Sequence, residues 1–171
     1  MAAPGQPREE AERVLTAFWP DRKVPVDPVA IARALGLEVK QGELPSEISG
    51  ALVKRAGADA VILLAQEDHP NRKRFTCAHE LGHFVRHAGS ASIERLDFRG
   101  PLAAPGLDKE EVFANQFAAN LLMPEAELRA AIQHQQTIWQ LSHLFGVSGE
   151  AMGYRLEQLL GVSFERSQIS R

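Results

Sequence analysis

Apolar residues recur every three or four positions through most of this chain, which is the spacing of amphipathic helices. Proline near the start of a segment, and glycine or proline just past its end, bound several of these patterns. The pattern predicts helices over residues 7–19, 28–35, 70–88, 108–123, 125–133, 137–145 and 148–160. Gly146 separates the last two and Ser148 caps the second of them, so this pair resembles a helix-turn-helix.

Three shorter stretches have the composition of strands: Leu37–Lys40, Ile48–Lys54 and Ala60–Ala65. The five residues between the last two include Gly57 and predict a hairpin. The last strand is almost wholly apolar and is expected at the centre of a sheet. The strand Ile48–Lys54 is more mixed, and it is either an edge that binds an extended substrate by strand addition or a half-exposed structural strand. Together these elements predict an α+β fold, mostly helical, with a small three-stranded antiparallel sheet.

The length of 171 residues is enough for one domain with a substantial core. We expect a disordered tail at residues 1–6, a core over 7–124 and the helix-turn-helix-like helical segment over 125–161. The structure after Gly161 is left open. Residues 89–107 contain clusters of glycine, serine and proline and are expected to form a long connection that borders a binding cleft.

Composition and charge exclude several classes of protein. The net charge is −3 and the pI about 6.1, so no strong positive field favours binding to nucleic acid. The single cysteine, Cys77, rules out an internal disulfide framework and is expected to be a small core residue. The first residues lack the apolar core of a signal peptide, and no stretch approaches the roughly 20 apolar residues of a membrane span. We therefore expect a cytoplasmic protein that binds no membrane.

The strongest chemical signal is an HExxH motif from His79 to His83, inside the segment RFTCAHELGHFVRH. Residues four apart share a helix face, so both imidazoles would point at a common spot, as they do in zinc sites. Glu80 lies about 100° further round the helix, where its carboxylate can act as a general base. The motif also arises by chance on amphipathic helices. In so apolar a helix, however, these ionisable groups would be costly without a metal or other partners.

A catalytic zinc takes three protein ligands and a water, so the third ligand must come from another element. The next helix contains EEVFANQFAANLLMP, in which Glu111 and Asn115 are four apart and share a face. The first would supply a ligand, and the second would hold a ligand imidazole in orientation. Acidic residues are also common in a first helical turn, and spacing alone does not choose between Glu110 and Glu111.

The two motifs, RFTCAHELGH and E-x-x-x-N-x-F-A-A-x-L-L-M-P, resemble in order and spacing those of the ImmA/IrrE-type zinc metallopeptidases. These are zincin-like proteins of bacteria and phages. The resemblance covers about Val26 to Leu160. It implies a zincin-like fold and one zinc ion per chain, with Glu111 as the third ligand beside His79 and His83. Such a donor set also accepts manganese.

Members of this family are similar in activity to site-specific endopeptidases that cut a helix-turn-helix repressor and so derepress its operon, in stress responses or in mobile-element and phage regulation. The resemblance implies a protein substrate of that kind, with Glu80 as the catalytic residue. One alternative is a metal-stabilised protein that sequesters a repressor without cutting it. Another is a DNA-binding regulator that acts through residues 137–160, although its second helix carries Glu150, Arg155 and Glu157 and no basic face. The candidates to stabilise the transition state are His143, Tyr154 and Arg155.

Overall fold

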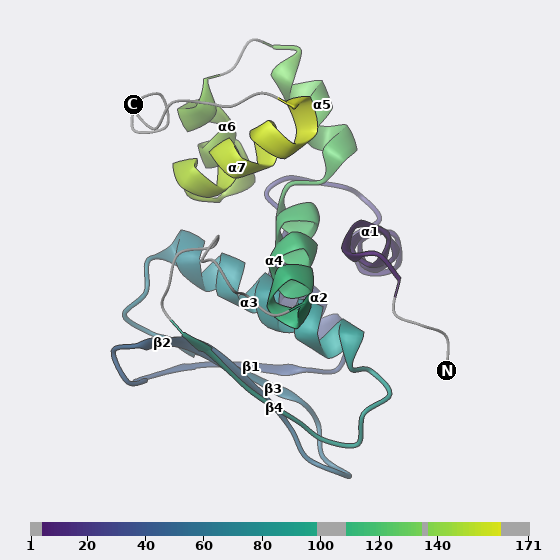
Figure 1. Ribbon diagram of the computed structural model, residues 1–171, viewed down its shortest axis with the longest axis vertical. Helices are drawn as coiled ribbons and strands as arrows, with labels where there is room; N and C mark the ends of the chain where they lie inside the picture. The colour runs from purple at the N-terminus through teal and green to yellow at the C-terminus, as the bar shows by residue number, and fades with distance from the viewer. Residues whose placement is uncertain (1–4, 99–108, 135–136, 162–171) are drawn as a thin grey trace.

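The computed structural model describes residues 5–98, 109–134 and 137–161. Its elements are α1 (Pro7–Phe18), α2 (Pro28–Ala34), β1 (Glu38–Gly42), β2 (Ile48–Lys54), β3 (Val61–Ala65), α3 (Pro70–Arg86), β4 (Ile93–Phe98), α4 (Lys109–Leu122), α5 (Glu125–Ile132), α6 (Ile138–Phe145) and α7 (Gly149–Leu160). The sheet lies at one end, α3 crosses its face, and α5 to α7 gather at the other end (Figure 1). The predicted α+β class, mostly helical, is confirmed. Among the described residues, no helix is long and apolar enough to cross a lipid bilayer.

The sheet is mixed and has four strands in the order β1-β3-β2-β4. β2 runs antiparallel to both its neighbours, with Ala51 opposite Leu63 of β3 and Leu96 of β4. β1 runs parallel to β3, with Val39 opposite Ile62. The prediction of a three-stranded antiparallel sheet is therefore wrong in strand number and in the direction of β1. The reason is that β3 inserts between β1 and β2, so β1 pairs with the second strand of the hairpin.

The fourth strand, β4, falls within the predicted connection from residue 89 to 107 and forms one edge of the sheet. Its apolar residues, Ile93, Leu96 and Phe98, do not alternate regularly with polar ones, so the two-residue period of a strand is absent. β4 covers β2 on the side away from β3, and the interpretation of β2 as an edge is wrong. Residues 99–108, which include the first residue of the helix predicted over 108–123, lie outside the described part of the chain.

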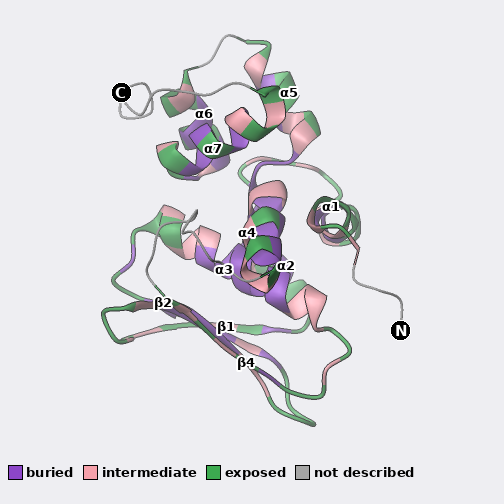
Figure 2. Cartoon of the chain, in the orientation of Figure 1, coloured by how far each residue is buried: buried purple, intermediate pink, exposed green. Residues whose placement is uncertain are grey.

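The core lies between the sheet, α3 and α4 (Figure 2). α3 packs so closely on β2 that a Cβ on Gly50 would lie 2.5 Å from the Thr76 methyl group, so only glycine fits there. Cys77 is fully buried, and burial raises the pKa of its thiol to about 12, as expected of an inert core residue. On α4, Phe113, Phe117, Leu121 and Leu122 are buried, whereas Val112 is 40% exposed. Large core side chains, each stabilising the fold by roughly 1.5–3 kcal/mol, include Ile62, Leu64, Leu81, Phe117 and Leu121.

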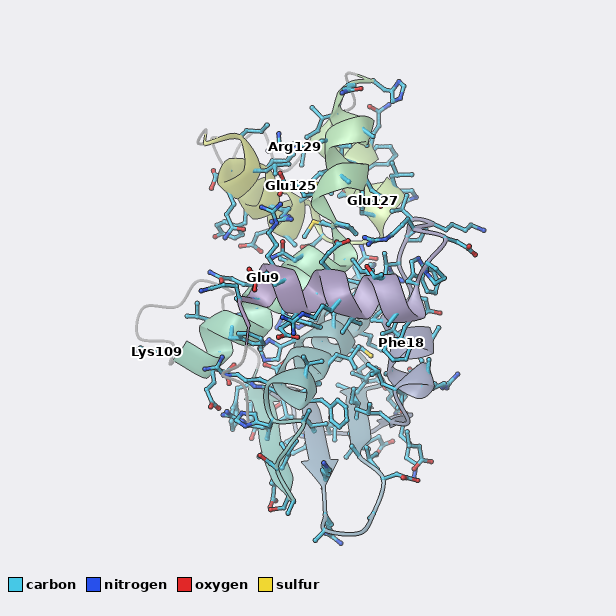
Figure 3. All side chains as sticks on the ribbon, turned by 90° about the vertical axis from the view of Figure 1, so that its right-hand side faces the viewer. Glu9, Phe18, Lys109, Glu125, Glu127 and Arg129 are labelled. Carbon is cyan, nitrogen blue, oxygen red and sulfur yellow. The ribbon has the colours of Figure 1, made fainter. Side chains whose placement is uncertain are left out.

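Helix α1 packs across α4 and buries Ala11, Val14 and Leu15 (Figure 3). Beside it, Glu125 of α5 pairs with Arg8 of α1, with 3.0 Å between the charged atoms. The Arg8 side chain is 71% exposed, and exposed ion pairs contribute little to stability. The apolar face of α1 therefore provides most of its attachment.

The two helices at the C-terminal end are joined as the sequence predicts. Thr137 and Gln140 form a capping box at the start of α6. Gly146 ends α6 with φ at 64°, the left-handed conformation that glycine adopts without strain. Ser148 then caps α7 by accepting a hydrogen bond of 3.1 Å from the backbone N–H of Ala151. The predicted pair of helices around a glycine turn is confirmed.

Arg74 of α3 ties this turn to the core. Its guanidinium donates to the backbone oxygens of Gly146 at 2.9 Å, Val26 at 2.6 Å and Phe145 at 3.4 Å. Asn71, one turn earlier, donates from Nδ2 to the backbone oxygen of Val147 at 2.9 Å. Burial lowers the pKa of the Arg74 guanidinium, and the carbonyl acceptors offset the cost of removing that charge from water.

Replacing Arg74 with alanine removes the guanidinium that these three carbonyls share. We expect the free energy of unfolding to fall by about 2–3 kcal/mol, measured by urea denaturation. Lys73→Ala is the matched control, because the Lys73 ammonium bonds to Gln41 and Gln66 at the surface and should contribute less than about 1 kcal/mol. Equal losses in the two variants would contradict this role for Arg74.

Candidate metal centre

Helix α3 places His79 and His83 in the interior of the molecule. The helix begins at Pro70, whose ring replaces an N–H that would lack a helical partner. His69 precedes it and accepts a hydrogen bond of 3.2 Å from the backbone N–H of Asn71 through Nδ1. His79 and His83 are only 3% and 2% exposed. The four-residue spacing thus brings both imidazoles to one buried spot, as the sequence predicts.

Possible metal-ligand atoms of three residues, His79, His83 and Glu111, converge there. The Nε2 atoms of His79 and His83 are 3.0 Å apart, and each lies 3.3 Å from a different carboxylate oxygen of Glu111. In a tetrahedral zinc site, bonds of about 2.0–2.1 Å set the ligand atoms about 3.3–3.4 Å apart. The observed triangle therefore has nearly the dimensions that a tetrahedral zinc ion requires.

Glu111, and not Glu110, faces the two imidazoles. Successive helical residues point about 100° apart, and Glu110 lies 3.1 Å from Nε2 of His87 instead. Glu110 also pairs with Arg95 of β4 and lies 3.9 Å from Arg86. The tertiary structure therefore separates the two acids that spacing alone left equivalent.

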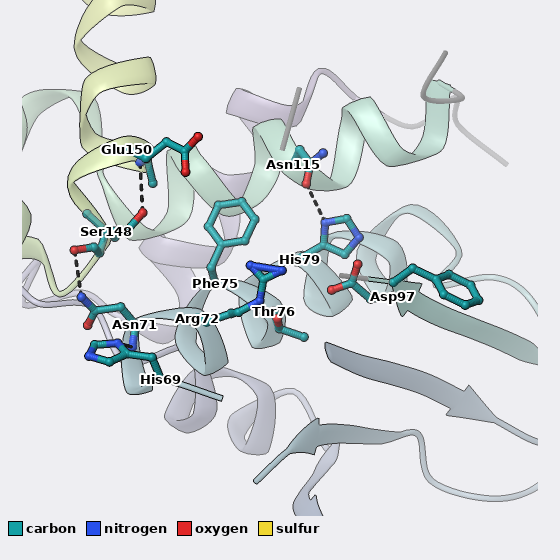
Figure 4. A pocket seen from close by; sticks show the side chains of 13 residues that line it. His69, Asn71, Arg72, Phe75, Thr76, His79, Asp97, Asn115, Ser148 and Glu150 are labelled. Carbon is teal, nitrogen blue, oxygen red and sulfur yellow. Dashed lines mark hydrogen bonds between the residues drawn. The ribbon is translucent and has the colours of Figure 1, made fainter. Parts of the chain in front are cut away.

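Asn115 lies one turn after Glu111 and orients a histidine. Its Oδ1 is 2.9 Å from Nδ1 of His79 (Figure 4). When Nδ1–H donates to this amide oxygen, the lone pair on Nε2 points into the ligand triangle. The contact has the position that the orienting role predicted for Asn115 requires.

Helices α3 and α4 approach each other closely at Gly82, inside the HExxH motif. A Cβ on this residue would lie 3.0 Å from Cα of Ala114 and 3.2 Å from Cβ of Phe117. Because Gly82 presents only hydrogen, the two backbones come close enough for Glu111 to reach both histidines.

The Glu80 carboxylate is fully buried, and neither of its oxygens has a hydrogen-bond partner among the described residues. Burial raises the pKa of Glu80 to about 8, although the neighbouring His79 opposes that shift. A buried carboxylate without partners is costly. A cation held by the ligand triangle would reduce this cost by favouring the ionised form.

Protonation of the three ligand residues is coupled. Burial, followed by the charge of His79, lowers the pKa of His83 and keeps that imidazole neutral. Burial also opposes charge on His79, but its contact with Glu111 raises the pKa of His79 above the usual range. The same hydrogen bond lowers the pKa of Glu111. The Glu111 carboxylate thus favours a proton on the imidazole of His79. A metal ion bound between the two residues would displace that proton.

Strand β4 supplies three nearby residues that the sequence does not single out. Asp97 and Phe98 line a cavity of about 450 Å³ beside His79, which agrees with the expectation that the stretch after α3 borders a cleft. The third residue, Arg95, lies 3.8 Å from Glu111. Burial raises the pKa of the Asp97 carboxyl. No local signal marks these residues, because β4 itself has no strand-like period.

The three candidates for transition-state stabilisation lie elsewhere, and none of them is among the described residues that line this cavity. His143 is stacked on Trp139, with ring centroids 5.3 Å apart. Tyr154 is 38% exposed on α7. Arg155 is buried and donates to Oδ1 of Asn120 at 2.9 Å.

The α+β fold is consistent with a zincin-like protein, and α3 and α4 carry the residues that could hold a metal ion. The chain belongs to the peptidase family described as the IrrE N-terminal-like domain, whose profile matches residues 32–157, and the predicted resemblance is confirmed. Among solved structures, the chain is similar to a Mycobacterium tuberculosis transcriptional regulator, with a TM-score of 0.62 and 22% identity over 88% of this chain. At that identity the similarity establishes a shared fold, and this chain spans 46% of that protein. No curated protein matches the chain.

Valine in place of Gly82 would press two methyl groups against α4. We expect the free energy of unfolding to fall by about 2–3 kcal/mol and zinc affinity to fall by about tenfold or more, because α4 carries Glu111. Urea denaturation and zinc titration against a coloured chelator measure the two effects. Gly42→Val in β1 is the control, since no atom lies within 4 Å of a Cβ there. Unchanged zinc affinity in the Gly82 variant would show that this contact does not position Glu111.

Proposed function

We propose that this protein is a zinc-dependent endopeptidase in which His79, His83 and Glu111 hold the metal and Glu80 is the general base. The observation that carries the proposal is the convergence of ligand atoms from His79, His83 and Glu111, with contacts of 3.0–3.3 Å between the residues, next to a buried carboxylate that has no hydrogen-bond partner in the described chain. The matching family of peptidases supports a hydrolytic role for this cluster.

The donor set suits zinc. Two imidazoles and one carboxylate, completed by water, form the ligand sets of many catalytic zinc sites, and manganese is the alternative ion for such donors. When bound, zinc supplies Lewis acidity and lowers the pKa of a coordinated water to about 7. A second possible ligand group, His83, His87 and Glu110, shares His83 with the first. Because Glu110 is already paired with Arg95, we assign one ion to each chain.

In this mechanism Glu80 moves the proton. Its carboxylate takes a proton from the attacking water and then gives it to the amine that leaves when the peptide bond breaks. A general base works best with a pKa near the working pH, and burial moves the pKa of Glu80 in that direction. Asn115 meanwhile holds the imidazole of His79 in the tautomer that a metal ligand needs.

The substrate we propose is a helix-turn-helix repressor, whose cleavage would derepress its operon. The motif resemblance supports this class of partner, and the fold shared with a transcriptional regulator is consistent with it. We place the reaction in the cytoplasm, where such a repressor acts.

Direct DNA binding through α6 and α7 is the weaker alternative. Arg155 is 7% exposed and donates to Asn120 and the backbone oxygen of Met123, so it is turned away from any phosphate backbone. The other charged residues of α7, Glu150 and Glu157, are acidic. These charges would repel a DNA backbone.

Metal analysis tests the ligand assignment. We expect about one zinc ion per wild-type chain by elemental analysis after purification in zinc without chelator. His83→Ala should contain none, because it loses one of the three ligands. His87→Ala, which changes the residue that caps the C-terminal end of α3, should keep its zinc. Absence of metal from the wild type would contradict the proposal.

The Glu80→Gln variant separates a peptidase from a protein that only sequesters its partner. We expect this variant to keep zinc and partner binding, while the rate of cleavage of a helix-turn-helix repressor falls by about 10²–10⁴-fold. Gel electrophoresis and mass spectrometry measure the cleavage. Glu94→Gln, an exposed carboxylate of β4, should cleave at the wild-type rate. A sequestering protein would bind the repressor and leave it intact in every variant.

A further inference from the structure

The cavity beside His79 extends from the metal centre to the turn between α6 and α7 (Figure 4). His79 and Asn115 lie on one side of the cavity and Ser148 and Glu150 on the other (Figure 4), and Val147 and Ala151 are also among its lining residues. Its volume of about 450 Å³ falls within the range of roughly 300–1,000 Å³ usual for ligand pockets. The cavity therefore lies between His79 of the candidate metal centre and the helices α6 and α7. The proposed chemistry gives these two helices no role.

The surface that the cavity offers is mainly apolar. Phe75 projects into it between Glu150 and Arg72 (Figure 4), and Phe98, Val147 and Ala151 add apolar wall. Much of the polar lining is already engaged within the protein. Nε of Arg72 donates to Oγ of Ser49 at 3.2 Å and lies 3.8 Å from Asp68, and Asn71 donates to the backbone oxygen of Val147.

The far wall of the cavity is held rigidly. The hydrogen bonds from Arg74 to Gly146 and from Asn71 to Val147 fix the α6–α7 turn against α3. Ser148 fixes the first turn of α7 by capping Ala151. These side chains bind the backbone of the wall and hold it in one shape. A site that selects side chains by size needs such a fixed wall.

We infer that this cavity is a specificity subsite that accepts a large apolar side chain, aromatic or branched, next to the scissile bond of the protein substrate. Phe75 and Ala151 set the size of the side chain that fits. The inference rests on the proposed peptidase function and gives the α6–α7 turn a task in selecting the substrate.

Hydroxamates test the subsite without needing the natural substrate. Two probes share the metal-binding hydroxamate and differ only in the neighbouring side chain, which is benzyl in one and hydrogen in the other. Binding to the zinc-loaded full-length protein is measured by calorimetry. We expect the wild type to bind the benzyl probe roughly tenfold or more tightly than the hydrogen probe, because the benzyl group leaves water for an apolar pocket.

Substitutions at the pocket then change this preference in opposite directions. Ala151→Trp fills the cavity and should abolish the preference for benzyl while zinc content stays at the wild-type level. Phe75→Ala enlarges the cavity and should bind a naphthylmethyl probe more tightly than the benzyl probe. Tyr154→Trp is the matched control, because Tyr154 lies on the same helix at an exposed position outside the cavity lining, and it should keep the wild-type preference.

The outcomes separate the two proposals. Zinc-loaded wild type without a benzyl preference, or Ala151→Trp with the preference intact, overturns the subsite and leaves the peptidase proposal standing. If Ala151→Trp does not fold, an unchanged ratio of naphthylmethyl to benzyl binding in Phe75→Ala overturns the subsite equally. A wild type that binds neither zinc nor any hydroxamate overturns the peptidase proposal, and the subsite with it.

Discussion

The contact between α3 and α4 at Gly82 is the constraint on which the site depends. The three ligand atoms come from two helices that are separate in sequence, and they converge only because the backbones approach closely. A single methyl group at Gly82 would meet the Cα of Ala114 at 3.0 Å, and backbone cannot move aside as a flexible side chain can. The same contact brings Asn115 to His79, so one small residue serves both a ligand and the group that orients it.

This contact concentrates ionisable groups in the interior, which would ordinarily destabilise the fold. His79, Glu80 and His83 are each at most 3% exposed, and the sheet behind them is so close that β2 carries Gly50 opposite Thr76. Burial raises the pKa of Glu80 and lowers the pKa of His83, and both shifts favour the neutral form of the side chain. These protonation states suit a bound cation. It would favour the ionised form of Glu80 and would bind the lone pair of the neutral His83 imidazole.

The C-terminal helices share the apolar core of the molecule and are also bound to α3 through backbone carbonyls. Arg74 and Asn71 project from the first turns of α3 and bind the turn that begins at Gly146. These turns and His79 belong to the same helix, α3. The α6–α7 turn is thus placed at a set distance from His79, and a rigid wall at that distance can discriminate between side chains of different size.

Features that depend on local chemistry could be predicted from the amino-acid sequence. Helix boundaries followed from Pro70, Gly146 and Ser148, and the shared face of His79 and His83 followed from the helical period, because both effects act within a turn or two of the chain. Only the tertiary structure decided between Glu110 and Glu111, inserted β3 between β1 and β2, and recruited β4 with Asp97 to the site. Those outcomes depend on which distant segments meet, and strand pairing and helix packing across long stretches of chain leave no periodic trace in either partner alone.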